Sequence, residues 1–195
     1  MTERIPKSQQ ADRTRRTILT AAQRRFSNEG FDRTTIRAVA MDASIDPSMV
    51  MRYFGNKEGL FAAAIEIDLE LPDFSQVART DLGIAVVRHF LSRWEAPDSG
   101  AQLRVLLSSS LTTTAAAEKV ATIFAGQLLP VVASVTSDPT EVVRRAGLVA
   151  TQILGFALCR YVLELPPIVE MAPDEAVAWL APVIDSYISG PTPAL

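Results

Sequence analysis

The sequence predicts an all-α protein, with an N-terminal three-helix domain that holds a helix-turn-helix and a C-terminal helical bundle domain, about nine or ten helices in all. Apolar residues recur at spacings of three and four over most of the chain, which is the period of an amphipathic helix. Glycine, proline and short polar clusters separate these periodic stretches. The pattern predicts no β-strand, no internal repeat and no low-complexity tract.

The N-terminal third begins with a polar stretch, residues 1–10, which contains Pro6 and is predicted to be a flexible arm. A helical pattern starts at Ala11, and Gly30 is expected to end it. One face of this helix carries the apolar residues Ile18, Leu19, Ala22 and Phe26. Four basic residues lie mostly off that face, as solvated charges or as phosphate contacts: Arg15, Arg16, Arg24 and Arg25.

Two short helices joined by a tight turn follow, which is the pattern of a helix-turn-helix. Thr34 or Thr35 is the expected N-cap of the first helix. An apolar stripe at helical spacing predicts its buried side: Ile36, Val39, Ala40 and Ala43. The turn is expected at residues 44–45. Asp46 then caps the second helix, and Pro47 takes its first position, where a missing N–H costs nothing.

The second helix, which ends at Phe54, is predicted to enter the major groove of DNA, and the whole DNA-binding domain is expected to span residues 11–56. Its inward residues would be Val50 and Phe54. Its outward residues would be Pro47, Ser48, Met49, Met51, Arg52 and Tyr53. Exposed methionines on so short a helix are unusual, but thymine methyl groups and phosphates would cover them. The alternative is that Met49 and Met51 pack against the first helix.

A connecting helix over residues 57–72 is expected to lead into a C-terminal domain, residues 73–195. Helical patterns in this domain run over residues 76–94, 101–110, 115–135, 140–164 and 174–189. Pro130 is predicted to kink the third of these helices or to split it in two.

The charge distribution separates the two parts of the chain. Residues 1–60 hold 11 Lys and Arg against 7 Asp and Glu, a net charge of +4, whereas residues 61–195 hold 8 against 15, a net charge of −7. The overall net charge of −3 therefore hides a basic N-terminal third that is suited to a polyanion.

Composition argues against several classes of protein. The hydrophobic content of 48% excludes a mainly disordered chain. We expect no signal peptide and no membrane span, because Gln152 and Arg160 interrupt the longest apolar region, residues 146–165. A single cysteine, Cys159, fits a cytoplasmic protein. Cys159 and the only histidine, His89, are expected to be packed residues, so no metal site, cofactor or enzymatic activity is predicted.

An ordered series of residues spans the predicted DNA-binding domain: Ile18, Leu19, Ala22, Phe26, Gly30, Phe31, Thr34, Thr35, Ile36, Val39, Ala40, Ala43, Tyr53, Phe54, Asn56, Lys57, Glu58, Gly59, Leu60 and Phe61. This series resembles the N-terminal domain of the TetR family of bacterial transcriptional regulators in order and in spacing. The segment from Tyr53 to Phe61 is its most specific part. The C-terminal domain is similar to the family only in the number and length of its helices.

The resemblance implies a repressor that binds a palindromic operator in double-stranded DNA as a homodimer and is released by a small-molecule effector. It also implies DNA contacts, namely Thr35 at a phosphate, Arg37 at a base or phosphate, Ser48 and Met49 at bases, and Tyr53 and Lys57 at phosphates. Two positions depart from the family pattern. Ser44 replaces a turn glycine, and Met51 replaces a tyrosine whose phosphate contact Arg52 would have to supply.

The helix over residues 146–165 is apolar nearly all round, so it must be covered on two sides. One side can pack on the body, and a second subunit is the natural cover for the other. In the family the last two long helices of each subunit form a four-helix bundle. The expected interface residues are Ile153, Leu154, Ala157, Leu158, Leu180 and Ile184.

An effector pocket is expected between the middle helices. Its predicted lining is mostly apolar, with a few polar groups: Phe90, Trp94, Leu107, Ser110, Phe124, Leu128, Gln152, Phe156 and Arg160. Such a lining would suit a hydrophobic molecule. Arg160 could instead reach the surface or pair with an acidic residue.

Two other hypotheses remain open at this point. One is a helical enzyme or small-molecule carrier in which the helix-turn-helix is only structural, although no paired catalytic groups or glycine-rich phosphate loop support it. The other is an activator, or a DNA-binding regulator without an effector.

Overall fold

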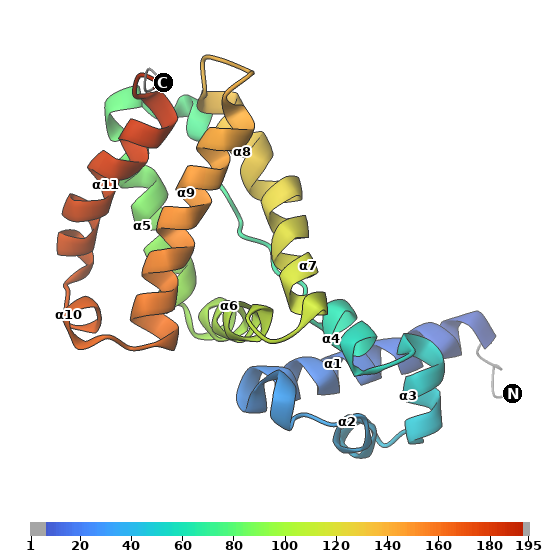
Figure 1. Ribbon diagram of the computed structural model, residues 1–195. Coiled ribbons are helices and arrows are strands. Elements are labelled where there is room, and N and C mark those ends of the chain that lie inside the picture. Colours follow the sequence, from blue (N-terminus) through green and yellow to red (C-terminus); the bar gives the residue numbers. More distant parts are fainter. Residues whose placement is uncertain (1–6, 193–195) are drawn as a thin grey trace, which may run out of the picture. The chain divides into compact units, whose positions relative to one another are not determined.

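The computed structural model describes residues 7–192, and these residues fold into two compact units. Unit 1 contains the chain up to Glu66 together with Ser109–Lys119, and unit 2 contains Ile67–Ser108 and the chain from Val120 onward. Residues 7–192 contain ten continuous helices and no strand, as the sequence predicts (Figure 1).

Unit 1 is built around a small aromatic core. Its helices are α1 (Lys7–Arg33), α2 (Ile36–Ala43), α3 (Pro47–Phe54) and α4 (Lys57–Ala64). Helix α1 packs on α2 and α4, and α2 packs on α3. The Phe61 ring meets Phe26 and Phe31 edge to face, with centroids 5.0 and 5.2 Å apart. Such pairs add specific geometry to the burial of the rings.

The first helix starts earlier than predicted. Helix α1 begins at Lys7, so residues 7–10 of the predicted arm are helical, and the rest of that arm, residues 1–6, lies outside the described residues. Gly30 interrupts the helix as expected, because its φ of 78° lies in the left-handed region that glycine tolerates. The buried Thr34 hydroxyl donates to the Gly30 carbonyl at 2.8 Å and fixes this break.

The connecting helix is much shorter than predicted, since α4 ends at Ala64 and residues 65–73 have no helical structure. The reason is an alternating pattern that the sequence interpretation missed: Ile65, Ile67, Leu69 and Leu71 are separated by acidic residues. This period of two suits an extended chain that buries alternate side chains. We call residues 67–71 the strap.

The strap obtains its backbone hydrogen bonds from side chains of unit 2. Gln127 accepts from the Leu69 N–H and donates to the Ile67 carbonyl, both at 2.8 Å. The Leu69 carbonyl lies 2.8 Å from His89 Nε2, and Arg93 donates to the Asp68 carbonyl. These contacts replace the bonds that a helix would have supplied.

Unit 2 is a helical bundle. After two short 3₁₀ turns, η1 (Phe74–Gln76) and η2 (Arg79–Asp81), come α5 (Leu82–Glu95), α6 (Pro97–Ser110), α7 (Thr114–Ile123), η3 (Phe124–Leu128), α8 (Leu129–Val135), α9 (Val142–Ala157), η4 (Leu158–Val162), α10 (Pro166–Val169) and α11 (Pro173–Ser189). Helix α11 packs on α5 and α9, so the three run side by side (Figure 1).

A glycine allows α5 and α11 to approach closely. A Cβ at Gly83 would lie 2.2 Å from the Ala181 carbonyl oxygen. The Gly83 N–H donates to Asp185 Oδ1 at 2.7 Å, so the two helices are hydrogen-bonded where they touch. Near the same end of α11, Arg145 donates to the Tyr187 and Gly190 carbonyls and holds the C-terminus of the helix.

The predicted distortion near Pro130 takes the form of a π-helical turn. Helices α7, η3 and α8 form one continuous helix, in which the Leu129 N–H bonds to the Phe124 carbonyl five residues earlier. A wider turn accommodates a proline that cannot donate and whose ring would crowd the preceding turn. Gln127, which holds the strap, belongs to this π turn.

Two continuous helices, Thr114–Val135 and Val142–Val162, are long and apolar enough to cross a membrane by length and composition alone. The expectation of no span relied on Gln152 and Arg160, which do not bring the second helix below that threshold. Little of either helix is buried within the structure. One or two such helices are weak evidence of a membrane protein, because helices of soluble proteins pass the same test of length and composition.

Candidate nucleic-acid interface

Helices α2 and α3 begin at the residues that the sequence predicts. Thr35 is the N-cap of α2, and its hydroxyl accepts from the Ala38 N–H at 3.1 Å. Asp46 is the N-cap of α3 and accepts from the Ser48 N–H at 2.8 Å, with Pro47 at the first helical position. Both helices are therefore fixed at their starts by local contacts.

The turn between the two helices has a left-handed residue. Ser44 has φ 54° and ψ 44°, and its N–H donates to the Met41 carbonyl. The Ile45 N–H donates to the Ala40 carbonyl, which completes a Schellman motif. Ser44 thus takes up the geometry that usually needs a glycine, at a steric cost.

The exposed face of α3 is defined by burial. Val50 is fully buried, and Pro47, Ser48, Met51 and Arg52 are exposed on the opposite side. Met51 is 44% exposed, so it does not pack away. Met49 and Tyr53, expected to face outward or along the groove, are half-buried and flank this face.

Phe54, predicted as an inward residue, is only half-buried. The guanidinium of Arg15 lies 5.6 Å from its ring centroid. Arg15 is itself exposed, and this cation–π contact places its guanidinium beside the end of α3. The guanidinium of Arg52 lies 5.9 Å from the Tyr53 ring centroid, which places it beside the predicted phosphate contact.

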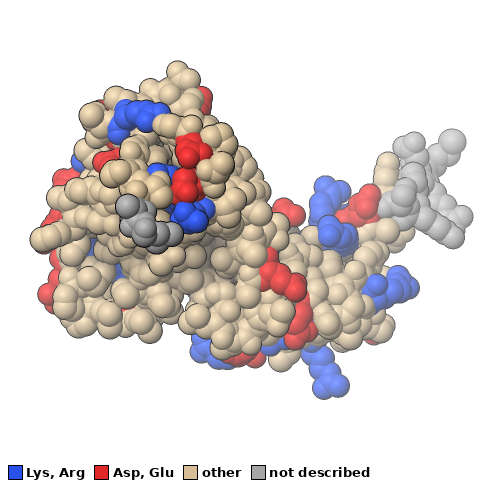
Figure 2. All heavy atoms as spheres, turned by 45° about the horizontal axis from the view of Figure 1, so that its top comes forward, with Lys and Arg blue, Asp and Glu red and all other residues tan. Residues whose placement is uncertain are grey.

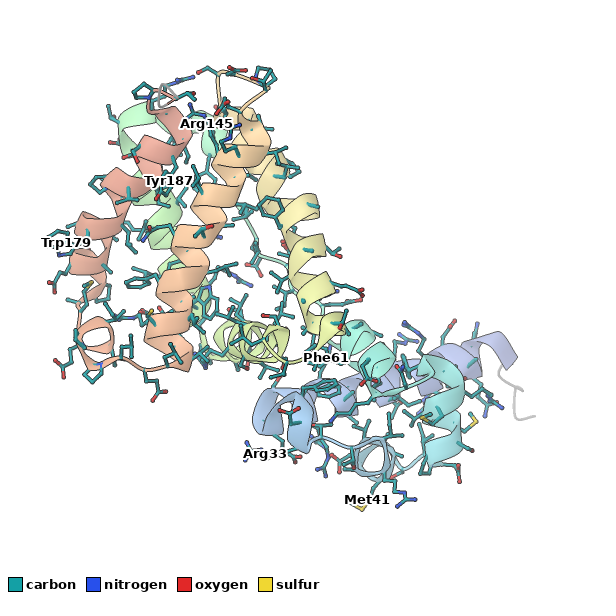
Figure 3. All side chains as sticks on the ribbon, in the orientation of Figure 1. Arg33, Met41, Phe61, Arg145, Trp179 and Tyr187 are labelled. Carbon is teal, nitrogen blue, oxygen red and sulfur yellow. The ribbon has the colours of Figure 1, made fainter. Side chains whose placement is uncertain are left out.

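Helix α2 contributes Thr35, Arg37 and a residue that sequence reasoning missed. Thr35 and Arg37 are both exposed, as predicted. Met41 is 71% exposed and points away from unit 1 (Figure 3). It lies one turn after Arg37 and off the apolar stripe of α2, and this position was the signal that could have identified it.

Lys57 does not project freely. Its Nζ donates to the Asp32 carbonyl at 3.1 Å and lies 4.3 Å from the centroid of the Phe31 ring. The ammonium group joins the end of α1 to the start of α4. To contact a phosphate, the Lys57 ammonium group would have to bind it alongside the Asp32 carbonyl and the Phe31 ring, or move away from them.

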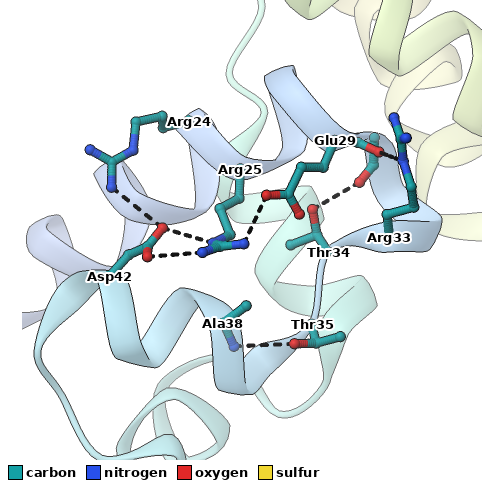
Figure 4. A network of polar contacts seen from close by, with 9 residues as sticks. Arg24, Arg25, Glu29, Arg33, Thr34, Thr35, Ala38 and Asp42 are labelled. Atoms are coloured by element: carbon teal, nitrogen blue, oxygen red, sulfur yellow. Dashed lines mark hydrogen bonds and ion pairs between the residues drawn. The ribbon is translucent and has the colours of Figure 1, made fainter.

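A network of charged side chains joins α1 to α2 (Figure 4). Asp42 accepts from Arg25 Nε at 2.7 Å and from Arg24 at 3.3 Å, and Arg25 also pairs with Glu29 at 2.8 Å. The hydrogen bonds from Arg25 hold the pKa of the Asp42 carboxyl below its usual range. The Arg25 guanidinium on α1 therefore holds α2 in place through Asp42. Figure 2 shows further Lys and Arg side chains at the surface of both units, interspersed with Asp and Glu.

The predicted pocket residues are only partly brought together. Phe90 packs against Trp94 and Phe156, with ring centroids 5.9 and 6.0 Å apart. Tyr161, which sequence reasoning missed, stacks on Trp94 at 5.2 Å because the π-helical end of α9 carries it there. We call Phe90, Trp94, Phe156 and Tyr161 the aromatic cluster.

Arg160 borders the aromatic cluster, and most of its guanidinium contacts are to other residues of unit 2. It donates to the Ile168 and Met171 carbonyls and pairs with Glu95 at 3.4 Å. Tyr161 reaches the same Glu95 carboxylate at 3.3 Å. Of the other predicted lining residues, Leu107 is buried, Phe124, Leu128 and Gln152 are half-buried, and Ser110 belongs to unit 1.

Half of the predicted dimer residues are buried within the subunit: Ala157 at the end of α9, and Leu180 and Ile184 on α11, which packs on α5 and α9. Ile153, Leu154 and Leu158 are half-buried. The exposed apolar side chains of α9 and α11 are instead Val143, Leu148 and Trp179, at 65%, 40% and 68%. Figure 3 shows Trp179 pointing away from the helices of unit 2.

Comparison with known protein families decides the identity. Residues 18–64 match the family described as bacterial regulatory proteins, tetR family, and residues 81–188 match the tetracyclin repressor-like C-terminal domain. The chain belongs to the TetR family. Its helix-turn-helix is therefore a DNA-binding element, and the chain is a transcriptional regulator of that family.

Relatives with known names match parts of this TetR-family chain. The transcriptional repressor NicS of Pseudomonas putida is 45% identical over 60 residues, which is 31% of this chain and 28% of that protein. The transcriptional regulator BetI of Burkholderia thailandensis is 29% identical over 110 residues, 56% of this chain and 50% of that protein. The matches thus span half or less of these relatives.

Solved structures match the TetR fold over nearly the whole chain. A TetR-family regulator of Streptomyces coelicolor A3 is 28% identical, with a TM-score of 0.64, over 96% of this chain and 99% of that one. The multidrug binding protein EbrR, solved with imidazole, has a TM-score of 0.66 over 93% and 92% of the two chains. At 19% identity, EbrR shows similarity of fold alone.

Proposed function

We propose that this chain is a cytoplasmic repressor that binds a palindromic operator as a homodimer and is released by a small hydrophobic effector. The observation that carries the DNA-binding part is the exposed face of α3, which opposes the fully buried Val50. A recognition helix needs one buried side and one free side to enter the major groove.

The residues of α2 and α3 divide into two groups by chemistry. Thr35, Arg37 and Tyr53 supply hydroxyl and guanidinium groups suited to phosphates, together with the N-terminus of α2. Ser48 and Met51 supply a hydroxyl and a thioether to base edges and thymine methyl groups. Arg52 takes the phosphate contact that the missing tyrosine at position 51 would have made.

Dimerisation follows from the exposed apolar residues on α9 and α11. The side chains of Val143, Leu148 and Trp179 are exposed to water if the chain stays monomeric. A two-fold contact through α9 and α11 covers these side chains. It also joins two helix-turn-helix units, so that the dimer binds the two half-sites of the operator at once.

The aromatic cluster of unit 2 is the proposed effector contact. Its rings offer stacking surfaces, and the Tyr161 hydroxyl offers a polar group beside Glu95. Burial raises the pKa of this hydroxyl to about 12, so it stays neutral at physiological pH. Effector binding would favour a dimer conformation in which the two recognition helices have the wrong spacing for the operator. The free energy of this shift is no larger than the difference in effector binding free energy between this conformation and the DNA-binding one.

The proposal is tested by fluorescence anisotropy with DNA that the purified protein selects from a random pool. Arg37→Ala and Arg52→Ala are expected to weaken binding by about tenfold or more. The matched control Arg88→Ala removes the same charge from an exposed residue of unit 2 and should change little. Equal effects of all three variants would contradict the proposed interface.

A further inference from the structure

The first turn of α3 begins with a hydrogen-bonded pair of exposed polar side chains, Asp46 and Ser48, of a kind that recurs at Asp73–Ser75 and Asp138–Thr140. Asp46 Oδ1 accepts the Ser48 N–H at 2.8 Å and also the Ser48 hydroxyl at 2.5 Å. A serine hydroxyl has one proton to donate and lone pairs that accept. Because Asp46 takes that proton, the free side of Ser48 Oγ can only accept a hydrogen bond.

No other side chain in the first turn supplies a donor, since Pro47 has no N–H and the thioether of Met49 has no proton to give. In the next turn Met51 has none either, and Arg52, which carries N–H donors, is the residue assigned to a phosphate. The hydrogen bond from the Ser48 hydroxyl, and to a smaller extent the bond from the Ser48 N–H, hold the pKa of Asp46 below its usual range. Asp46 is therefore an anion at neutral pH and accepts only.

The bases of DNA differ in what they present to such a surface. In the major groove, cytosine and adenine present an exocyclic amino group, which donates, whereas guanine and thymine present O6 and O4, which accept. An acceptor set against an acceptor loses its bond to water without replacing it. The first turn of α3 thus suits amino groups and rejects carbonyl groups.

We infer that Asp46 fixes Ser48 as an obligate acceptor and thereby makes this turn select cytosine or adenine at one position of each half-site. Ser48 touches the base, and Asp46 is a positioning residue that acts through it. This inference rests on the proposed DNA-binding function and adds a rule of base choice to it.

The test compares the wild-type protein with Ser48→Ala and Asp46→Gly, on DNA that the wild-type protein selects from a random pool. Glycine is tolerated at a helix N-cap at a cost of a few tenths of a kcal/mol, so α3 is retained. At the position assigned to Ser48, the amino group alone is removed by placing purine for adenine or pyrimidin-2-one for cytosine.

Loss of that amino group should weaken wild-type binding by about fivefold to tenfold, as for one hydrogen bond at an otherwise satisfied site. Ser48→Ala should bind the original and the altered DNA equally. Asp46→Gly should tolerate guanine or thymine at this position, since the freed hydroxyl can now donate. If Asp46→Gly fails to fold, the Ser48→Ala comparison still decides.

Selection of guanine or thymine at this position by the wild-type protein, or an unchanged base preference in Ser48→Ala, would overturn the inference. Either result would leave salt-dependent DNA binding intact, so the proposed function would stand. Absence of any salt-dependent binding would instead remove the proposed function itself.

Discussion

The guanidinium of Arg25 holds both oxygens of the Asp42 carboxylate, with Nε 2.7 Å from Oδ2 and Nη2 3.0 Å from Oδ1. This paired contact fastens α2 to α1, and it orients the face of α2 that carries Arg37. Two parallel bonds of this kind fix direction as well as distance. The position of α2 in the helix-turn-helix therefore depends on the Arg25–Asp42 contact, which is not one of the proposed DNA contacts.

The Asp42–Arg25 contact makes the stability of unit 1 dependent on pH. The pKa of folded Asp42 is lowered, so its contribution is complete above the ordinary value of about 3.8 and is lost as pH falls through the folded pKa. We expect Asp42→Asn to lower the melting temperature at pH 7, and the difference from wild type to vanish in strong acid. Asp174→Asn, in an exposed pair with Arg88, is the control and should change little at any pH. A difference that grows as pH falls would contradict this account.

Ser44 is a position where the native residue is strained. Its left-handed backbone costs an L-residue about 1 kcal/mol more than glycine. Ser44→Gly is therefore expected to raise the free energy of unfolding in urea by about 1 kcal/mol. The control Ser108→Gly, on the exposed side of α6, should lower it by roughly 0.5 kcal/mol because glycine weakens a helix interior. Destabilisation by Ser44→Gly would show that the turn is not strained.

Gln127 tests the role of the strap. Replacement by Leu leaves the Leu69 N–H and the Ile67 carbonyl without partners, which should cost about 2 kcal/mol. Gln127→Glu keeps an acceptor for the Leu69 N–H but sets a carboxylate oxygen against the Ile67 carbonyl in place of the donor. Hydrogen exchange at the Leu69 amide should therefore accelerate strongly in Gln127→Leu and much less in Gln127→Glu. Equal protection in all three proteins would show that the strap is held by other contacts.

Trp179 tests the proposed dimer. We expect Trp179→Glu to shift the protein from dimer to monomer in sedimentation at micromolar concentration, because a charge replaces a large apolar side chain in the covered face. Ile84→Glu makes the same kind of change on the exposed side of α5 and should remain dimeric. Operator affinity should fall with the dimer in Trp179→Glu. A wild-type protein that sediments as a monomer would contradict the proposed assembly.

The parts of the fold that local chemistry decides were predictable. Thr35, Asp46 and Pro47 are specific helix-start residues, and the structure uses each of them as predicted. Gly30 and Pro130 marked two of the places where a helix is interrupted or distorted, whereas no such residue marked the π-helical turn Leu158–Val162. These residues act through their own backbone geometry, so no knowledge of the tertiary structure was required.

The misses have physical causes of a different kind. The alternation from Ile65 to Leu71 is short and follows a helical pattern without a break, so the sequence pattern predicts more helix there than the structure has. Helix α11 is apolar on more than one side, and only packing against α5 decides that Leu180 and Ile184 lie inward and Trp179 outward. The contacts of Lys57 with Phe31 and Asp32 were not predictable, because the tertiary structure sets these neighbours; its phosphate contact stays a prediction.

The central claim is that α2 and α3 bind DNA, and the most direct test is the salt dependence of binding to the selected operator. We predict that affinity falls roughly 10³-fold between about 50 and about 200 mM salt, because a dimer that neutralises several phosphates releases that many counterions. Arg52→Ala should reduce the slope of log affinity against log salt by about one for each phosphate that the variant no longer neutralises, and Arg88→Ala should leave the slope unchanged. An affinity that does not depend on salt, or no binding at low salt, would contradict the account.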